Sequence, residues 1–252
     1  MIDVWNYITS FIERDKDKCN LLMTSQKLSN CKVFFNEMIN IDVINKSKWF
    51  HQFTNILTNE LITLPKNLKI LNFADRFNGP INNYVPHGVV HLSFGYMFNQ
   101  PLYECIPSSV THLEFRDKKI NNNIYHSSFS YSLANSVPSS VKYLLIDSNI
   151  TNCNDIDKLT SITHMTINRF HGQKYNNIPP SVSHLTINNC YVLTNMFPSS
   201  VTHLTLMTDY GSNLKHYIPT SVKKIYFHNI NKHFQKRIII ELRGLNAEIE
   251  FL

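Results

Sequence analysis

Charge and glycine are both scarce in this chain of 252 residues. Charged residues make up 17% of it, which is low for a soluble protein, and only 6 residues are glycine. The sequence has no glycine-rich phosphate loop, no G-x-S-x-G nucleophile motif and no H-E-x-x-H zinc motif. We therefore expect a protein that is not an enzyme and that uses no metal or cofactor.

Paired cysteines are also missing. The 5 cysteines are an odd number and none has C-x-x-C spacing, so we expect reduced thiols, as in cytosolic or nuclear proteins. No apolar run approaches the ~20 residues that cross a bilayer. Asp3 and the charged run Glu13–Lys18 interrupt the segment where a signal peptide would lie. The expected location is the cytoplasm, without membrane contact.

Basic residues outnumber acidic ones, and the net charge is +6. They are dispersed, however, and near the start of the chain Arg14, Lys16 and Lys18 alternate with acidic residues. The densest basic set lies near the C-terminus and consists of Lys223, Lys224, Lys232, Lys236 and Arg237. We interpret these charges as a solvated surface, and nucleic-acid binding stays a less favoured alternative.

What the sequence does contain is an internal repeat. Eight segments follow the pattern of residues 106–115, IPSSVTHLEF. Their second residues are Pro65, Pro86, Pro107, Pro138, Leu159, Pro179, Pro198 and Pro219. Subtracting neighbouring positions gives spacings of 21, 21, 31, 21, 20, 19 and 21 residues. A period this constant is typical of a solenoid built from stacked units.

Each repeat position predicts a local structure. Proline favours a turn before a strand, and the serines that follow it can hold that turn by hydrogen bonds to local backbone. Apolar residues then recur at positions 1, 4 and 6, as in Val110, Leu113 and Phe115. The last two share one strand face, and the first points inward only if the backbone bends after it. This is the leucine-rich-repeat spacing.

The period leaves roughly fifteen residues for the return to the next strand, too few for a long helix with two turns. We therefore predict extended or single-turn returns and one parallel sheet. The expected fold class is α+β, with a short N-terminal helical module before a leucine-rich-repeat-like solenoid whose parallel β-sheet lies on the concave side. Two inward rows should form its core, one being Leu113, Leu144, Met165, Leu185, Leu204 and Ile225, and the other Phe115, Ile146, Ile167, Ile187, Leu206 and Phe227.

Two returns add a second pattern, because residues 73–81 read FADRFNGPI and residues 94–102 read FGYMFNQPL. Together with the Pro-Ser-Ser-Val-Thr-His-Leu segments, this resembles the FNIP repeat, a divergent leucine-rich-repeat type of social amoebae and giant amoebal viruses. The resemblance covers about eight repeats in residues 64–229. It implies protein binding, in the host cytoplasm if the gene is viral, and a host–virus interaction in that case.

The first 46 residues have an apolar pattern of short helices. Val4, Ile8, Phe11 and Ile12 have the spacing of one helix face, the leucines at 21, 22 and 28 suggest a second helix, and residues 33–39 suggest a third. Residues 3–12, DVWNYITSFI, and 21–28, LLMTSQKL, resemble an F-box without its usual Leu-Pro opening. A plain helical cap on the first repeat is the alternative. We expect a linker or cap in residues 47–63 and a C-terminal cap in 230–252.

The F-box resemblance implies a function. Such a module binds a Skp-type adaptor, and the repeats would hold a target protein for a cullin-type (Skp–cullin–F-box) ubiquitin ligase. The residues implied in adaptor binding are Val4, Trp5, Ile8, Phe11, Ile12, Leu21 and Leu22. The alternative is a scaffold of the leucine-rich-repeat kind, without a link to ubiquitin, that binds a protein or peptide on its concave face.

Histidine recurs at one repeat position, directly before the inward leucine. Neighbouring parallel strands lie about 4.8 Å apart, so we expect these side chains to form a column on the concave face. A straight ladder does not converge as tetrahedral zinc requires, which makes metal binding the weaker interpretation. The predicted target-binding residues are His91, His112, Glu114, Tyr143, His164, Thr166, His184, Thr186, His203, Thr205, Lys224 and Tyr226, and binding should change between about pH 5.5 and 7.5.

Two further segments carry predictions. Residues 121–132 account for the long spacing and are expected to be a surface insertion. After the eighth repeat, Ile238–Ile240 and Ile249–Phe251 keep apolar spacing without the Pro-Ser-Ser turn. We predict a short helix followed by a last strand that covers the core of the stack.

Overall fold

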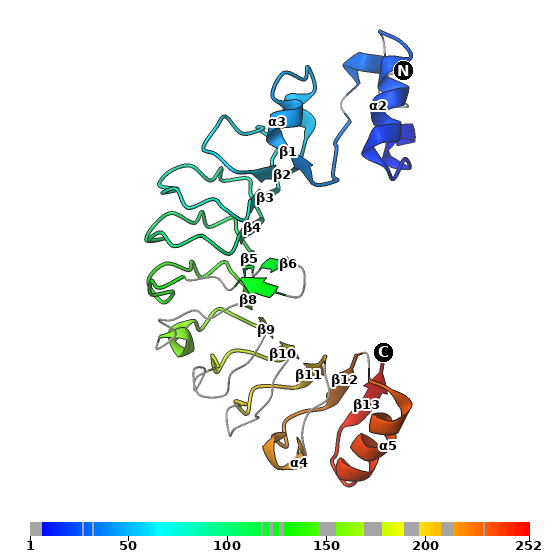
Figure 1. The fold of residues 1–252 in the computed structure, drawn as a ribbon, viewed down its shortest axis with the longest axis vertical. Helices are drawn as coiled ribbons and strands as arrows, with labels where there is room; N and C mark the ends of the chain where they lie inside the picture. Colours follow the sequence, from blue (N-terminus) through cyan, green and yellow to red (C-terminus); the bar gives the residue numbers. More distant parts are fainter. Residues whose placement is uncertain are drawn as a thin grey trace.

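The computed structural model describes residues 7–26, 28–31, 33–116, 118–120, 123–125, 129–146, 155–168, 178–188, 197–207, 214–228 and 230–252. These residues form a curved stack of parallel strands, with the N-terminal helices at one end of the arc and the C-terminal helix at the other (Figure 1). Figure 1 shows the strands along the inner side of the arc and the returns along its outer side.

One open sheet of 11 strands runs through the stack. Its order is β1 (Ile39–Asn40), β2 (Asn55–Thr58), β3 (Ile70–Phe73), β4 (His91–Phe94), β5 (His112–Phe115), β8 (Tyr143–Ile146), β9 (His164–Asn168), β10 (His184–Asn188), β11 (His203–Leu206), β12 (Lys224–Phe227) and β13 (Glu248–Phe251). All pairs are parallel. The eight predicted repeat strands and the predicted last strand are therefore confirmed. The sheet also extends beyond them, because β2 lies in residues 47–63, assigned to a linker or cap, and β1 lies in residues 1–46, assigned to the helical module.

The apolar positions of the repeat build the core. Leu185 is 1% exposed, and the other residues of the two predicted rows are buried to a similar degree. The first apolar residue is buried as well, because the backbone turns where the proline stands: Val110 N–H donates to the Pro107 carbonyl at 3.0 Å. The same bond, between residues three apart, recurs in all eight repeats. Directly after Val110, the N–H groups of Thr111 and His112 both donate to the Val90 carbonyl, at 2.9 and 3.1 Å, which is the predicted bend after position 1.

The serine of the turn has a different role from the one predicted. Ser109 Oγ donates not to its own turn but to the carbonyl of Val89 in the preceding repeat, at 2.7 Å. Ser181, Ser200 and Ser221 repeat this bond to the preceding unit. A stacked fold leaves turn carbonyls of one unit facing the next, so the hydroxyl satisfies a group that only the neighbouring repeat supplies.

The returns are extended or single-turn, as predicted, in the part of the chain that the structure describes. Their helical turns are η3 (Ile156–Lys158) and α4 (Leu214–Tyr217). In the first returns, phenylalanines stack along the arc: the ring centroids of Phe77 and Phe98 are 6.2 Å apart, and Phe98 lies 6.2 Å from Phe129. Phe129 therefore continues the column of the two Phe-Asn returns. It lies within the predicted insertion 121–132 but is fully buried, so the prediction of a surface insertion is wrong at this position.

The N-terminal module is helical only in part. Residues 7–10 are helical, followed by α2 (Asp15–Met23) and the short η1 (Leu28–Asn30). The helix predicted over residues 33–39 is wrong, because Phe35 pairs with Phe53 as a parallel bridge and Ile39 begins β1. The short helices α3 (Ile41–Ile44) and η2 (Phe50–Gln52) follow within the first sheet units. Segment 33–39 joins the sheet because Phe35 and Phe53 bury their rings together, with stacked centroids at 4.5 Å.

A buried ion pair holds α2 against the start of the sheet. Lys18 Nζ lies 2.8 Å from Asp15 Oδ1, and these residues are only 4% and 8% exposed, so this part of the charged run is not solvated as predicted. Lys18 also donates to the Phe34 carbonyl, and Asp15 accepts from Glu37 N–H at 2.7 Å. The pair therefore satisfies backbone groups that flank the first sheet residues, and it fixes α2 to the stack.

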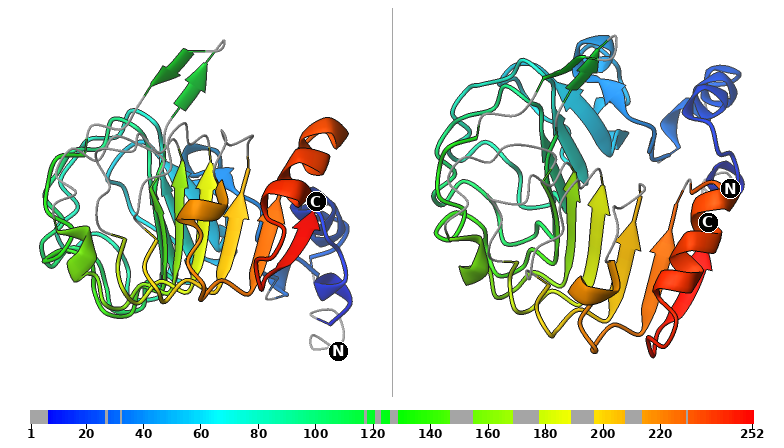
Figure 2. Two further views of the ribbon diagram at one scale, coloured as in Figure 1. Left: turned by 90° about the horizontal axis from the view of Figure 1, so that it is seen from below. Right: turned by 60° about the horizontal axis from the view of Figure 1, so that its bottom comes forward.

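Both remaining predictions concern segments outside the regular repeat. The insertion after β5 contains an antiparallel hairpin, β6 (Lys118–Ile120) with β7 (Asn123–Tyr125), which stands clear of the stack in Figure 2. At the C-terminus, α5 (Lys232–Glu241) begins after Asn231, whose side chain accepts from Phe234 N–H at 3.0 Å. β13 then pairs with β12, which confirms the predicted helix and terminal strand.

Candidate functional site

The candidate site is the sheet face turned away from the core, called the inner face below. One row of this face joins residues that are exact register partners: Ile70, His91, His112, Tyr143, His164, His184, His203, Lys224 and Glu248. Their neighbours toward the core are buried, whereas the row itself is partly or fully exposed. The predicted histidine column therefore exists as a continuous row across the strands.

Six rings of this row stack on one another. The centroids of His184 and His203 are 4.2 Å apart with an interplanar angle of 7°, and His164 lies 4.3 Å from His184. Tyr143 continues the stack between His112, at 4.1 Å, and His164, at 4.3 Å. The spacing of parallel strands is close to a ring-stacking distance, which explains why flat side chains recur at this position.

In four of the five histidines of the row, the hydroxyl of the preceding residue fixes the ring, and His91 follows Val90 instead. Thr111 Oγ1 lies 2.8 Å from His112 Nδ1, and the hydroxyls of Thr163, Ser183 and Thr202 make the same contact at 2.9 Å. Nδ1 of each of these rings therefore contacts a hydroxyl group within the protein. In His164, His184 and His203, Nε2 is then the ring nitrogen that can bond to a partner. The Ser/Thr-His dipeptide of the repeat is thus one structural unit.

Three of the stacked histidines, His112, His164 and His184, have a pKa below that of free histidine. Burial lowers the pKa of His164 and His184, and the other histidines of the stack lower it further by charge repulsion. The pKa of His112 is also lowered, by burial and by His91, although Glu114 acts in the opposite direction. The neutral form of His112, His164 and His184 is therefore favoured, and any pH-dependent binding through these three rings is expected below pH 6.5 rather than across the whole predicted range.

A second row of the inner face follows two residues later on each strand. It contains Asn72, Ser93, Glu114, Leu145, Thr166, Thr186, Thr205, Tyr226 and Glu250. The hollow between β5 and β9, about 170 Å³ in volume, includes His112, Glu114, Tyr143, Leu145, His164 and Thr166 in its lining. The twelve predicted target-binding residues all lie in these two rows, outside the core. Their role in binding stays a prediction.

A hydrogen-bonded network occupies the N-terminal part of the second row. Glu114 Oε2 accepts from Arg116 Nε at 2.7 Å, and Glu114 Oε1 lies 2.9 Å from His91 Nε2. Arg116 and Ser93 both donate to Asn72 Oδ1. Burial raises the pKa of Glu114, but the hydrogen bond from His91 and the charge and hydrogen bond of Arg116 lower it to about 2. Glu114 therefore stays ionised and paired.

Asn72 and Arg116 belong to this network but were not predicted as site residues. Arg116 follows β5 and reaches Asn72 two strands away, a contact that no local sequence pattern encodes. The alternation of strand faces could have identified both residues. Asn72 is at the repeat position of Glu114, and Arg116 is two residues after Glu114, so both fall on the same face as Glu114.

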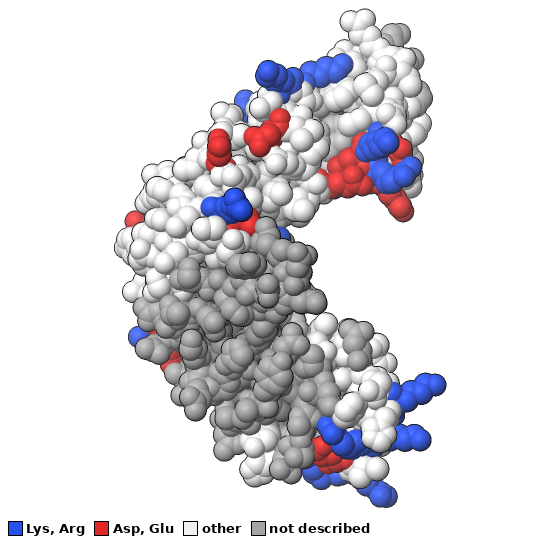
Figure 3. Space-filling view, viewed as in Figure 1, with Lys and Arg blue, Asp and Glu red and all other residues white. Residues whose placement is uncertain are grey.

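The charges on the inner face are largely neutralised. Lys224 Nζ lies 2.9 Å from Glu248 Oε2 and 3.7 Å from Glu250 Oε1, so the lysine of the first row is ion-paired. Outside the inner face, basic side chains gather at the C-terminal end of the arc, as Figure 3 shows, where Lys232, Lys236 and Arg237 on α5 are exposed. A neutral face with amphipathic side chains suits protein recognition better than binding to phosphates.

Metal binding gains no support from the geometry. Within the described ranges no group of three or more His, Cys, Asp or Glu residues is placed to hold a metal ion. The stacked rings lie parallel, so their nitrogens do not converge.

In the part of the chain that the structure describes, no helix has the length and apolar character to cross a membrane.

The residues implied in adaptor binding are distributed differently. Val4 and Trp5 lie outside the described residues. Phe11 is 67% exposed and Ile8 is 39% exposed, so both are accessible to a partner. Ile12 and Leu21 are partly buried, and Leu22 is fully buried in the core. The accessible apolar surface of this module therefore includes the segment around Ile8 and Phe11, whereas Leu22 holds α2 to the rest of the protein.

Comparison with known proteins identifies the repeat. The family model of the FNIP repeat matches residues 59–97 and 98–148. No curated protein and no solved structure matches the chain significantly. The second matched segment includes the insertion and ends two residues after β8. Residues 59–148 are thus FNIP repeats, and the chain is a repeat protein of a kind that mediates protein interactions.

Proposed function

We propose that this protein holds a partner protein on the concave inner face and acts as the substrate-recognition subunit of a cullin-type ubiquitin ligase. The observation that supports the binding face is the unbroken row of six stacked rings across strands β4 to β11. These rings are exposed in part and cost little conformational entropy on binding, because stacking and hydroxyl contacts already fix them.

The character of the face supports a protein partner. Tyr143 is 40% exposed and lies beside Leu145, in a hollow whose lining also includes Thr166 and His164. Aromatic and apolar groups with nearby hydrogen-bonding side chains are typical of the centres of protein interfaces. Lys224 is paired with Glu248, and Arg116, next to the second row, is paired with Glu114. Neither cation is therefore free to attract a phosphate backbone.

The ligase role rests on the resemblance of residues 3–12 and 21–28 to an F-box. Two features of the structure agree with it. Tyr7, Ile8 and Phe11 leave apolar side chains accessible. The Asp15–Lys18 pair attaches α2 to the sheet, so an adaptor bound to the module would have a defined position relative to a target on the inner face.

Co-purification with a Skp-type adaptor from amoebal lysate tests this function. Two full-length variants separate its parts: Ile8→Glu with Phe11→Glu changes the exposed module surface, and Thr186→Arg blocks the inner face. We expect the wild type to capture adaptor and target, the first variant to lose only the adaptor, and the second to lose only the target. Circular dichroism should show that both variants remain folded.

The scaffold function is the second candidate, and the same experiment distinguishes it. Capture of a specific protein that Thr186→Arg abolishes, with no adaptor bound to the wild type, would leave binding on the inner face and exclude the ligase role. A wild type that captures neither class of protein would overturn the proposal.

A further inference from the structure

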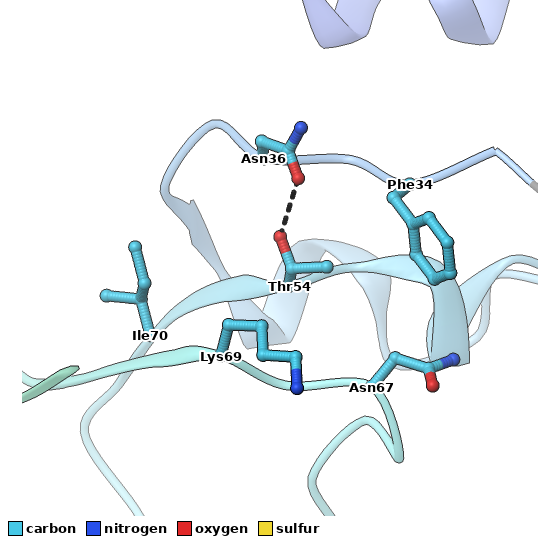
Figure 4. Close-up of a pocket in the computed structure, with 6 residues that line it drawn as sticks. All are labelled: Phe34, Asn36, Thr54, Asn67, Lys69 and Ile70. Atoms are coloured by element: carbon cyan, nitrogen blue, oxygen red, sulfur yellow. Dashed lines mark hydrogen bonds between the residues drawn. The ribbon is translucent and has the colours of Figure 1, made fainter. Parts of the chain in front are cut away.

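A hollow lies at the N-terminal end of the inner face, apart from the predicted binding residues. Its volume is about 510 Å³, and it is lined by Phe34, Asn36, Thr54, Asn67, Lys69 and Ile70 (Figure 4). This size falls within the range of roughly 300–1,000 Å³ that is usual for ligand pockets. Most of the surface that these residues expose in the hollow is apolar, although the hollow opens to solvent.

The apolar wall is held in place from behind. Phe34 is 49% exposed, but its carbonyl accepts from the buried Lys18 at 3.1 Å. The next residue, Phe35, is fully buried, and its carbonyl accepts from Thr54 N–H at 2.9 Å. The Phe34 ring therefore projects from a fixed backbone and is not part of the core. An aromatic side chain presented in this way needs no rearrangement before it contacts a ligand.

The opposite side of the hollow carries one cation. Lys69 Nζ has a 3.5 Å contact with the Gly88 carbonyl, and Lys69 forms no ion pair within the described residues. Across the hollow, Thr54 Oγ1 lies 2.9 Å from Asn36 Oδ1, so the polar groups there bond to each other (Figure 4). An apolar hollow beside a single ammonium group that has no carboxylate partner among the described residues suits an apolar side chain with a carboxylate close by.

The hollow is continuous with the stacked row. Ile70, part of its lining, is the register partner of His91, the first ring of the stack. From Ile70 to His203 the row crosses six strand intervals, or ~29 Å at ~4.8 Å each. An extended chain rises ~3.3 Å per residue, so about nine residues reach from the hollow to the far end of the row.

We propose that the hollow anchors a linear, extended segment of the partner protein, whose bulky apolar side chain lies between Phe34 and Ile70 while a neighbouring carboxylate pairs with Lys69. The remainder of the segment runs along the stacked row. This inference deepens the proposed binding on the inner face and rests on it. It adds an anchor and a sequence preference, an apolar residue next to Asp or Glu at one end of a stretch of about nine residues.

A displayed library of random ten-residue peptides, selected on the full-length protein, tests the anchor. We expect the enriched peptides to share an apolar residue beside an acidic one near one end. Phe34→Ala should weaken their binding at least tenfold and Lys69→Glu severalfold. The matched controls are Phe11→Ala and Lys66→Glu, which change another exposed aromatic ring and another exposed lysine outside the hollow, and they should change affinity less than twofold.

A double-mutant cycle makes the contact specific. Replacing the apolar peptide residue by Ser should weaken binding to the wild type at least tenfold but should have little further effect on Phe34→Ala. Additive effects would overturn the anchor, as would failure to enrich any peptide or enriched peptides insensitive to Phe34→Ala.

The proposed function has a separate readout. Peptides or partners that Thr186→Arg releases but Phe34→Ala does not would leave binding on the inner face intact and reject the anchor alone. Insensitivity to both variants would reject both proposals.

Discussion

The two halves of the inner face are built on the same core but differ in how their exposed side chains are satisfied. In the half formed by β3 to β5, Asn72 and Ser93 are only 3% and 1% exposed, because Arg116, Glu114 and their partners bond across three strands. In the half formed by β9 to β11, the threonines of the same row are partly exposed, and beside them are the stacked rings of His164, His184 and His203.

The two halves therefore differ in how many polar groups they leave available to a partner protein. Polar groups that already bond to each other have little left to offer a partner, whereas the second half presents imidazole Nε2 atoms and hydroxyls whose local geometry is fixed. The change between halves falls at the β5–β8 junction, where the hairpin is inserted. We therefore expect the network half to matter mainly for stability and the histidine half mainly for binding.

The largest effect is expected from the core that both halves share. Leu185→Asp places an unpaired charge in a site that is 1% exposed, and Leu92→Asp does the same in the other half at 0%. Each should cost more than about 4 kcal/mol and unfold much of the stack. Circular dichroism and urea titration measure this loss. A cooperative, wild-type-like unfolding curve for either variant would contradict the shared core.

The second prediction tests the difference between the halves directly. Glu114→Gln removes the charge that pairs with Arg116 and His91 and should lower the free energy of unfolding by about 1–3 kcal/mol. Thr186→Val, at the matching position of the other half, should change it by less than about 0.5 kcal/mol. Urea midpoints of both variants give the comparison. Equal effects would mean that the two halves do not differ as described.

The third prediction concerns the junction. Ser109→Ala removes the hydroxyl bond to the preceding repeat and should cost about 1 kcal/mol. Ser140 holds the same repeat position just after the insertion, but its Oγ is buried without a hydrogen-bond partner among the residues that the structure describes. Ser140→Ala should therefore be close to neutral, and thermal denaturation of both variants measures the difference. A loss at Ser140 as large as that at Ser109 would show that the insertion does not interrupt the serine contacts between repeats.

The smallest effect is expected from pH. Burial and the neighbouring rings lower the pKa of His164 and His184 from 6.5, so the unfolded chain takes up these protons at a higher pH than the folded chain. Stability should be complete above pH 6.5 and should decrease as the pH falls below that value. Replacing His164, His184 and His203 by Gln should flatten this dependence in urea titrations at pH 7.5 and 5.5. An unchanged slope would contradict the assignment.

Much of the architecture could be predicted because it depends on periodicity. The positions of Leu113 and Phe115, and of their equivalents in each repeat, require only that apolar residues share one strand face. The row of histidines follows from the same alternation. The helix predicted over residues 33–39 failed because Phe35 and Phe53 meet across the chain, and apolar spacing in a short segment does not distinguish a helix from a strand.

The sequence by itself determined the repeat, the register and the buried rows, since each follows from a local pattern copied along the chain. Only the tertiary structure decided which polar groups meet. Asp15 and Lys18 lie three residues apart yet became buried because the Phe34 carbonyl and the Glu37 amide complete their bonds. Arg116 reaches Asn72 across two strand intervals. Such contacts depend on side-chain directions between units, which a one-dimensional pattern does not contain.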